Sequence, residues 1–373
     1  MPILPLSQKI GSYLSYYLAG KFLWAIELLK KIFLTRVKES GELAMSIESI
    51  GLKNFTVFED FQLEVSSGIN LFIGENGTGK THLLKAIYAT CELSRAESQN
   101  DELLKCFKEK QQEANLLRNK NIGQLTVSIT SEGVIRKQVR GSELTEYFLE
   151  IPDGIKLPAV YIPVKDMLTH SAGFLAMANK YRDFPFDKTL TDIVIKASQW
   201  KVKQPPKLAL AILPILEEMI DGVVVFENDE FYIKKNNGQM ILFELEAEGL
   251  KKIGLLWQLL MTDNLNEDSI LIWDEPEANL NPKFLPKIVE CLLELSRHDV
   301  QIFLSTHNYI FAKYFDVAKK ENDSLLFHSL YFEKKSEGVK CETQPYFETL
   351  RHNEISAAFN HLLERVYQIQ IGD

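Results

Sequence analysis

A glycine-rich turn followed by lysine and threonine has the residue types and the spacing of a phosphate-binding loop. The pattern G-x-x-x-x-G-K-[ST] is complete and ends in Lys80 and Thr81. Glycine lacks a Cβ, so the backbone can curve closely around an anion, and a helix beginning near Lys80 would point its positive end at the same place. Lys80 would reach the β- and γ-phosphates, and the Thr81 hydroxyl would hold Mg²⁺. The residues expected to contact the nucleotide are Gly74, Glu75, Asn76, Gly77, Thr78, Gly79, Lys80, Thr81 and His82.

Two carboxylates at the end of a second apolar run have the chemistry that such a site needs. Residues 269–275 predict a strand that finishes in Asp274 and Glu275. Asp274 would hold Mg²⁺ through water or together with Thr81, and Glu275 would polarise or orient the attacking water as general base. Strands also end in acids for solvation alone, but the phosphate-binding turn upstream favours the functional interpretation.

A histidine follows a third predicted strand within residues 299–308. His307 can hydrogen-bond a γ-phosphate and sense its hydrolysis. A single histidine at a strand end is usually structural, but its position after the acid-bearing strand favours a functional role. We therefore expect Lys80, Glu275 and His307 to be catalytic, Thr81 and Asp274 to bind the metal, and ATP and Mg²⁺ to be the cofactors.

The elements that must position these residues predict an α/β fold with a mixed sheet. Short apolar runs of strand length are separated by turn residues, and one long stretch has a helical pattern. The expected parts are an N-terminal helical arm over residues 1–44, a core domain over residues 45–373, an inserted helical subdomain over residues 164–221 and a helix-forming segment over residues 246–261. Hairpins are expected around residues 131–133, 236–238 and 329–341.

Composition limits the class of protein. The chain of 373 residues is 46% hydrophobic and 25% charged, which is ordinary for a globular protein. Its net charge of −9 gives no overall attraction to nucleic acid, so nucleic-acid binding would need a local patch, for which residues 95–123 are one candidate. The four cysteines are far apart and form no C-x-x-C pair, which predicts reduced thiols in a cytoplasmic protein.

The N-terminal arm admits three interpretations. Residues 7–37 carry many aromatic and aliphatic side chains, but Lys21, Glu27, Lys30 and Lys31 interrupt the run. A bilayer span needs about 20 predominantly apolar residues, so no transmembrane segment is expected here. The arm is an amphipathic helix docked on its own domain, a helix for a partner or for self-association, or an interfacial membrane helix.

The order of these motifs resembles the ABC-class P-loop ATPases, in the branch that contains RecF, SMC and OLD-like proteins. The phosphate-binding turn, the run from Ile272 to Pro282 and the run from Leu304 to Asn308 carry the resemblance, which covers residues 45–373. It implies an ATP-binding α/β lobe, a helical lobe and a head-to-tail homodimer, or a higher oligomer, that encloses ATP. The adenine contact would come from Phe55 or Phe58.

The resemblance also implies a contact between subunits. The segment matching the family's signature motif ends in Gly249, which would meet the γ-phosphate bound to the opposite subunit, and the family's serine falls at Ala247. The missing hydroxyl implies a slow ATPase that acts as a switch. The chain shows neither the clustered acids of a Toprim nuclease after His307 nor the long heptad repeats of SMC-like members.

We therefore expect a stand-alone ATPase that controls a separate effector protein, plausibly in bacterial anti-phage defence. The alternatives are a DNA-repair-type ATPase that clamps nucleic acid, the ATPase subunit of a transporter, and an ATP-binding scaffold that hardly turns over. Ala247 favours the scaffold, whereas the intact set of Asp274, Glu275 and His307 favours an enzyme.

Overall fold

The computed structural model describes residues 45–95, 102–108, 116–118, 122–129, 133–139, 149–150, 155–180 and 185–371. The chain divides into two units, residues 1–45 and residues 46–373, and the architecture below is that of the second unit. The helix predicted within the N-terminal arm lies outside the described residues, as does much of the polar segment 95–123.

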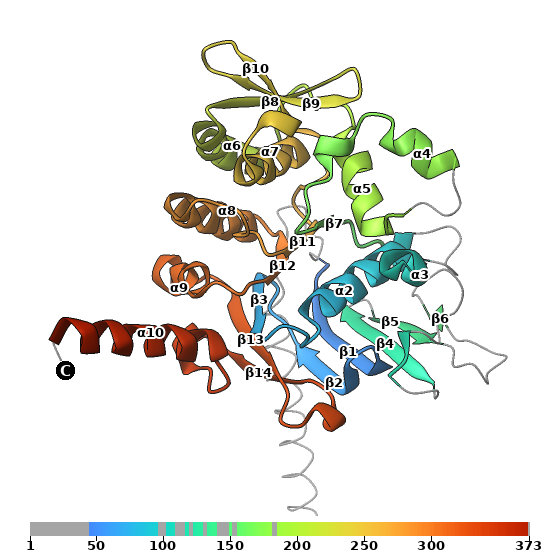
Figure 1. Cartoon of the computed structure of the whole chain (residues 1–373). Coiled ribbons are helices and arrows are strands. Elements are labelled where there is room, and N and C mark those ends of the chain that lie inside the picture. The colour runs from blue at the N-terminus through green and yellow to red at the C-terminus, as the bar shows by residue number, and fades with distance from the viewer. Residues whose placement is uncertain are drawn as a thin grey trace, which may run out of the picture. The chain divides into compact units, whose positions relative to one another are not determined.

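A six-stranded mixed sheet forms the centre of this unit, in the order β14-β13-β3-β12-β11-β7 (Figure 1). All neighbouring strands are parallel except β14, which pairs antiparallel with β13. The strands are β3 (Ile69–Gly74), β7 (Ala159–Ile162), β11 (Ile270–Asp274), β12 (Gln301–Ser305), β13 (Leu325–Tyr331) and β14 (Lys340–Gln344). Every residue of β3, β7, β11 and β12 is buried, as expected of parallel strands covered on both faces. The predicted α/β class and the mixed sheet are confirmed.

Helices cover both faces of the central sheet. Helix α2 (Lys80–Arg95) lies on one side, and α8 (Leu285–Arg297) and α9 (Tyr309–Ala318) lie on the other (Figure 1). Helix α8 has its apolar residues at helical spacing and buries them, including Ile288, Leu292 and Leu295. These helices pack against the sheet because one face of each is apolar.

A second, antiparallel sheet has the order β2-β1-β4-β5-β6. Its strands are β1 (Ile47–Phe55), β2 (Phe58–Glu64), β4 (Gly123–Ile129), β5 (Gly133–Val139) and β6 (Leu149–Glu150), and α3 (Glu102–Phe107) packs on α2 beside them. The pairing of β4 with β5 confirms the hairpin predicted around residues 131–133.

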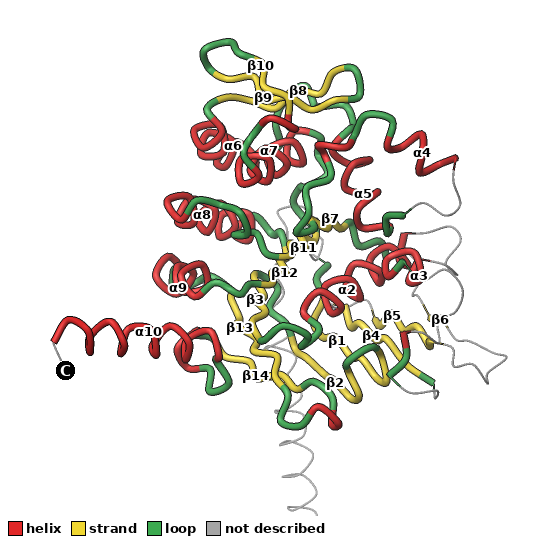
Figure 2. The backbone as a smooth tube through the Cα atoms, viewed as in Figure 1, coloured by secondary structure: helices red, strands yellow, loops and turns green. Residues whose placement is uncertain are grey.

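The middle of the chain forms a helical region next to a small sheet, as the tube in Figure 2 shows. Helices α4 (Phe174–Lys180), α5 (Lys188–Ala197) and α6 (Lys207–Ile220) precede β8 (Gly222–Glu227), β9 (Glu230–Lys235) and β10 (Met240–Leu242), and α7 (Glu248–Met261) follows. The antiparallel pairing of β9 with β10 confirms the turn predicted at residues 236–238, and the β13–β14 pair confirms the predicted C-terminal hairpin.

The last helix, α10 (Glu354–Ile371), contacts the body near its first turns. The Phe359 ring stacks on Tyr309 with centroids 4.1 Å apart. Farther along, Leu362, Val366 and Ile369 are 56%, 40% and 78% exposed. No helix in the described part of the chain is both long enough and apolar enough to cross a bilayer.

A buried glutamine joins the two large sheets. Gln301 begins β12, and its amide nitrogen donates hydrogen bonds to the carbonyls of Ile47 and Ser66, each 2.8 Å away. Its amide oxygen accepts a hydrogen bond from the Ile47 N–H at 2.9 Å. Because all these groups are buried, they depend on one another to replace their bonds to water.

We predict that Gln301→Leu lowers the free energy of unfolding by about 3 kcal/mol, since it leaves buried backbone groups without partners. The measurement is chemical denaturation monitored by tryptophan fluorescence. The matched control is Gln62→Leu on the exposed side of edge strand β2, which should change the free energy by less than about 0.5 kcal/mol. Equal effects of the two substitutions would contradict the role given to Gln301.

Candidate functional site

The parallel register brings the expected site residues to one edge of the central sheet. Strand β12 lies between β3 and β11, with Ser305 opposite Asp274 on one side and opposite Phe72 on the other. The phosphate-binding turn leaves β3 at Gly74, and His307 follows β12. Segments more than 190 residues apart in sequence therefore meet where three parallel strands end, as the 193-residue separation of the bonded pair Thr81 and Asp274 shows.

The turn after β3 requires its glycines. Gly74 and Gly79 have φ angles of 144° and 88°, which side chains disfavour. A Cβ on Gly74 would lie 2.3 Å from the Leu330 carbonyl oxygen, and one on Gly79 would lie 2.5 Å from Cγ2 of Val57. The next residues of the turn, Glu75, Asn76 and Gly77, are exposed, whereas Thr78 is buried and its hydroxyl donates to the Glu75 carbonyl at 2.8 Å.

Lys80 points back along the turn. Its ammonium group donates hydrogen bonds to the carbonyl oxygens of Gly74 and Glu75 at 2.8 and 2.9 Å. Burial lowers the pKa of Lys80 to about 8, while the nearby carboxylates of Glu275 and Asp274 act in the opposite direction. The side chain is thus a cation held at the mouth of the loop, within reach of a phosphate that the loop would bind.

Asp274 joins the helix of the turn to the neighbouring strand. Its Oδ2 accepts a hydrogen bond from the Thr81 hydroxyl at 2.8 Å and a longer one from the Tyr161 hydroxyl at 3.4 Å. Its Oδ1 accepts a hydrogen bond from the Ser305 hydroxyl. The hydroxyl and carboxylate oxygens of Thr81 and Asp274 are the hard ligands that Mg²⁺ prefers, so these residues fit the metal expected from the sequence.

Glu275 and His307 face each other next to the Asp274 network. The His307 Nε2 and the Glu275 Oε1 lie 3.7 Å apart, and both side chains are about one-third exposed. Burial, and then the charge of Lys80, lower the pKa of His307 below its ordinary value, so the imidazole is neutral at pH 7. Glu275 has a left-handed backbone with φ of 50°. Solvent therefore reaches a carboxylate and a neutral imidazole beside the turn.

The N-terminus of α7 lies beside the loop that follows β11. A Cβ on Gly249 would lie 2.6 Å from the Asn279 carbonyl oxygen, so this glycine is needed for close packing within its own chain. Gly249 is buried, whereas Ala247 and Glu248 are exposed. Ala247 is the N-cap residue of α7. Its side chain has no acceptor, so it cannot cap the first N–H groups of the helix.

Three residues expected to contact the nucleotide pack against aromatic rings in the structure. The proposed adenine contacts Phe55 and Phe58 are both fully buried, and they pack against Phe107 and Phe61. The prediction is wrong because neither ring has an open face on which a base could stack. His82 lies on α2 directly after Thr81, and its ring meets the Phe107 ring edge-on with centroids 5.8 Å apart.

Sequence reasoning missed several polar residues that support the site. Ser305 and Tyr161 bond Asp274, and Lys252 donates to the Glu275 carbonyl at 3.0 Å. Only Ser305 had a usable signal, because a buried strand rarely ends in consecutive polar residues without a reason. The other two come from distant parts of the chain and are found only through the fold.

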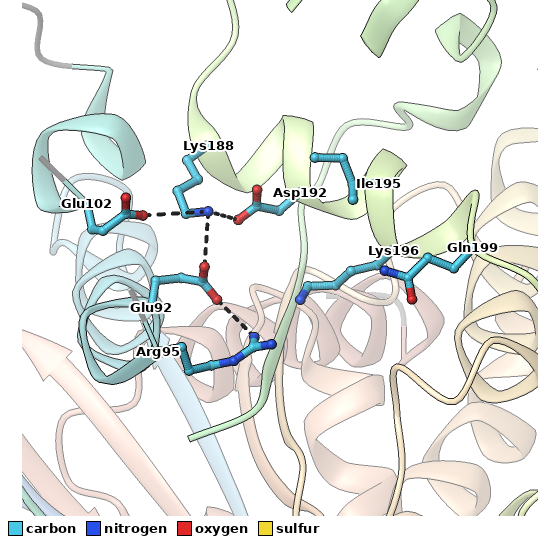
Figure 3. Close-up of a pocket in the computed structure, with 8 residues that line it drawn as sticks. All are labelled: Glu92, Arg95, Glu102, Lys188, Asp192, Ile195, Lys196 and Gln199. Atoms are coloured by element: carbon cyan, nitrogen blue, oxygen red, sulfur yellow. Dashed lines mark hydrogen bonds and ion pairs between the residues drawn. The ribbon is translucent and has the colours of Figure 1, made fainter. Parts of the chain in front are cut away.

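A separate charged pocket of about 370 Å³ lies between α2, α3 and α5 (Figure 3). At its centre the Lys188 ammonium lies 2.7 Å from Asp192, 3.0 Å from Glu92 and 3.6 Å from Glu102. Burial disfavours the charged form of Lys188, but Asp192 and Glu92 outweigh it and raise its pKa. Because the Lys188 ammonium already pairs with these carboxylates, we interpret the cluster as a set of ion pairs that holds the three helices together and not as a metal site.

Two protein families match the sequence. Residues 45–132 match the family described as "AAA ATPase domain". Residues 143–312 match the family described as "AAA domain, putative AbiEii toxin, Type IV TA system". Together the matched ranges contain the phosphate-binding turn, the acids after β11 and His307.

Curated relatives and one solved structure agree with these matches. The chain is 34% identical over 91 residues to the DNA replication and repair protein RecF of Listeria welshimeri, which is 24% of this chain and 25% of that protein. It is 53% identical over 47 residues to RecF of Cytophaga hutchinsonii, or 13% of this chain and 12% of that protein. The chain thus matches about a quarter or less of these relatives. The SMC head bound to the C-terminal winged-helix domain of ScpA aligns with a TM-score of 0.52 and 14% identity, over 80% of this chain and 97% of that chain.

The fold and the site define a P-loop protein of the ABC class. Strands β3, β12 and β11 bring the phosphate-binding turn, His307 and the paired acids together, as described above. Within that class, the chain is similar to RecF over part of its sequence and to the SMC head in its fold. Its similarity to the two ATPase families implies nucleotide binding.

We predict that Ser305→Ala raises the Mg²⁺ concentration needed for half-maximal ATP binding about tenfold, since removing an outer partner of a metal ligand commonly costs that much. The measurement is a Mg²⁺ titration with a fluorescent ATP analogue. The matched control is Ser269→Ala at the opposite end of β11, where the hydroxyl bonds Asn266 instead. Unchanged Mg²⁺ dependence in Ser305→Ala would contradict the assignment of Asp274.

Proposed function

We propose that this protein binds and hydrolyses ATP slowly and acts as a switch. The observation that carries the proposal is the Asp274 network, in which the Thr81 and Ser305 hydroxyls donate to one carboxylate at the end of β11. Two hydroxyls that orient one buried carboxylate beside a phosphate-binding turn form a site for a metal–nucleotide complex. A purely structural turn would not need a buried acid at this point.

Each residue of the site has a definable part in hydrolysis. Lys80 exchanges its hydrogen bonds to the turn carbonyls for bonds to the phosphates, and Thr81 and Asp274 hold Mg²⁺, which neutralises phosphate charge when bound. Glu275 orients or deprotonates the attacking water. His307, being neutral, donates a hydrogen bond to the γ-phosphate and loses that partner after hydrolysis. The protein would switch between a state in which His307 is bonded to the γ-phosphate and a state in which His307 lacks this partner.

We further propose that two copies enclose ATP head-to-tail. The exposed N-terminus of α7 supports this, because Ala247 has no side chain that caps the helix and a helix N-terminus attracts anions. Glu246 and Glu248 flank Ala247 and oppose a phosphate there, and the serine hydroxyl of the signature motif is missing. Weak binding of the ATP phosphate at this end of α7 would account for slow hydrolysis of ATP.

We also propose that the switch controls a separate effector protein in bacterial anti-phage defence. The match of residues 143–312 to a family described as a putative AbiEii toxin of a type IV toxin–antitoxin system supports this setting. No group of three His, Cys, Asp or Glu side chains that could hold a metal ion occurs in the described residues. In this proposal the switch acts on another protein.

The second candidate is an ATPase that clamps nucleic acid, and the RecF relatives favour it. A clamp predicts that duplex DNA stimulates hydrolysis and that DNA affinity falls steeply with salt. Hydrolysis rates that do not change across DNA lengths would exclude the clamp and leave the effector switch.

We predict that Glu275→Gln binds ATP like the wild type but doubles its molar mass with Mg-ATP and turns over at least about 100-fold more slowly, since it lacks the base. The measurements are light scattering and phosphate release. Lys80→Ala is the control, because it loses the cation at the phosphates and should neither bind ATP nor change mass. Equal turnover of wild type and Glu275→Gln would remove Glu275 from this role.

We also predict that deleting residues 1–44 abolishes assembly with the effector or with further copies, since the arm offers the apolar helix pattern of a contact surface. Size-exclusion chromatography with light scattering measures the size of the assembly, and a pull-down that compares the full-length chain with the shortened chain measures partner binding. Unchanged assembly size together with unchanged partner binding would show that the arm serves its own domain.

A further inference from the structure

A second glutamate after β11 holds the backbone next to His307. Glu277 is only 8% exposed and lies in the loop between Glu275 and the start of α8. Its Oε1 accepts a hydrogen bond from the Thr306 hydroxyl at 2.6 Å and one from the His307 N–H at 3.3 Å. The carboxylate therefore fixes the end of β12 from which the His307 side chain projects.

A second buried charged side chain, Lys252 of α7, lies in the same interior. Glu277 Oε2 is buried and has no hydrogen-bond partner among the described residues. Burial lowers the pKa of Lys252, and among the charges that oppose this effect Glu277 ranks first. Burial likewise raises the pKa of Glu277 to about 6. The hydrogen bonds from Thr306 and from the His307 N–H oppose the effect of burial on the pKa of Glu277 and favour its charged form.

Lys252 connects the loop that carries Glu277 to α7. Its ammonium donates to the Glu275 carbonyl at 3.0 Å and is 5% exposed. One turn earlier, Gly249 packs against the Asn279 backbone in the same loop. The loop of residues 275–279 is thus held by α7 on one side and by the end of β12 on the other.

We propose that Glu277 is a positioning residue that acts through His307, and that with Lys252 it links the N-terminal turn of α7 to the end of β12. This inference rests on the proposed function, because it gives the site a route by which contact at α7 reaches the γ-phosphate sensor. The route runs from Lys252 to the Glu275 carbonyl, along the loop to Glu277, and from the Glu277 carboxylate to Thr306 and the His307 backbone. Its coupling can be measured with a double-mutant cycle.

The central test is Glu277→Gln, which keeps the size of the side chain and one acceptor oxygen but removes the negative charge that accepts from Thr306 and the His307 N–H. We expect kcat to fall about tenfold with KM for ATP within about twofold, since a displaced catalytic group costs rate more than binding. In a His307→Ala background, the same substitution should change kcat by less than about twofold. A full tenfold loss in that background, or wild-type kcat in Glu277→Gln alone, would overturn the proposal.

Two further variants keep the test decisive. Thr306→Val removes one donor to Glu277 with little change in shape, and it should give the same kcat-against-KM split if Glu277→Gln does not fold. Glu290→Gln on the exposed side of α8 is the matched control and should leave both constants unchanged.

A readout without turnover separates this inference from the proposed function. The His307 imidazole resonance in a proton–carbon NMR spectrum, assigned by its loss in His307→Ala, should shift in Glu277→Gln and not in Glu290→Gln. A wild type that binds but does not hydrolyse ATP would refute the proposed hydrolysis, and the resonance would then decide the positioning role by itself. An unmoved His307 resonance would overturn that role.

Discussion

One buried carboxylate, Asp274, orders the functional edge of this protein. It ends a strand in which every residue is buried, so its charge must be met by hydrogen bonds from its neighbours. Thr81, Ser305 and Tyr161 provide them from three different elements. Because each donor has to be placed within bonding distance, the register of β11 with β12 and the start of α2 are tied to this one side chain. A nucleotide site built on these groups is therefore already arranged before any ligand arrives.

Buried polar side chains elsewhere perform the same task between sheets. Gln301 satisfies backbone groups of the antiparallel sheet from the central sheet. Next to it, Asn70 Oδ1 accepts from the Ser66 N–H at 2.7 Å and from the His328 ring at 3.1 Å. Burial lowers the pKa of His328 to about 3, so this ring is neutral and acts as a hydrogen-bonding bridge. Apolar packing alone holds sheets together but leaves their relative register free, whereas these bonds accept one register only.

The loop after β11 connects the site to α7. Its Glu275 faces His307, its Glu277 holds the backbone of His307, and its Asn279 packs on Gly249 of α7. A displacement of α7 must therefore be accommodated either in this loop or at the backbone of His307.

The sequence by itself determined the phosphate-binding turn, the paired acids, the positions of the main strands along the chain and the α/β class. These features are local: glycines with positive φ, apolar runs and Asn-Gly turns express their preferences over a few neighbouring residues. Only the tertiary structure decided which distant polar groups meet. Tyr161, Lys252 and Glu277 gain their hydrogen-bond partners only when distant parts of the chain pack together. The residues next to them in the sequence do not indicate which partners these are. The same reason explains the error at Phe55 and Phe58, whose aromatic type predicts a stacking surface as well as a core, and whose burial is set by the sheet that covers them.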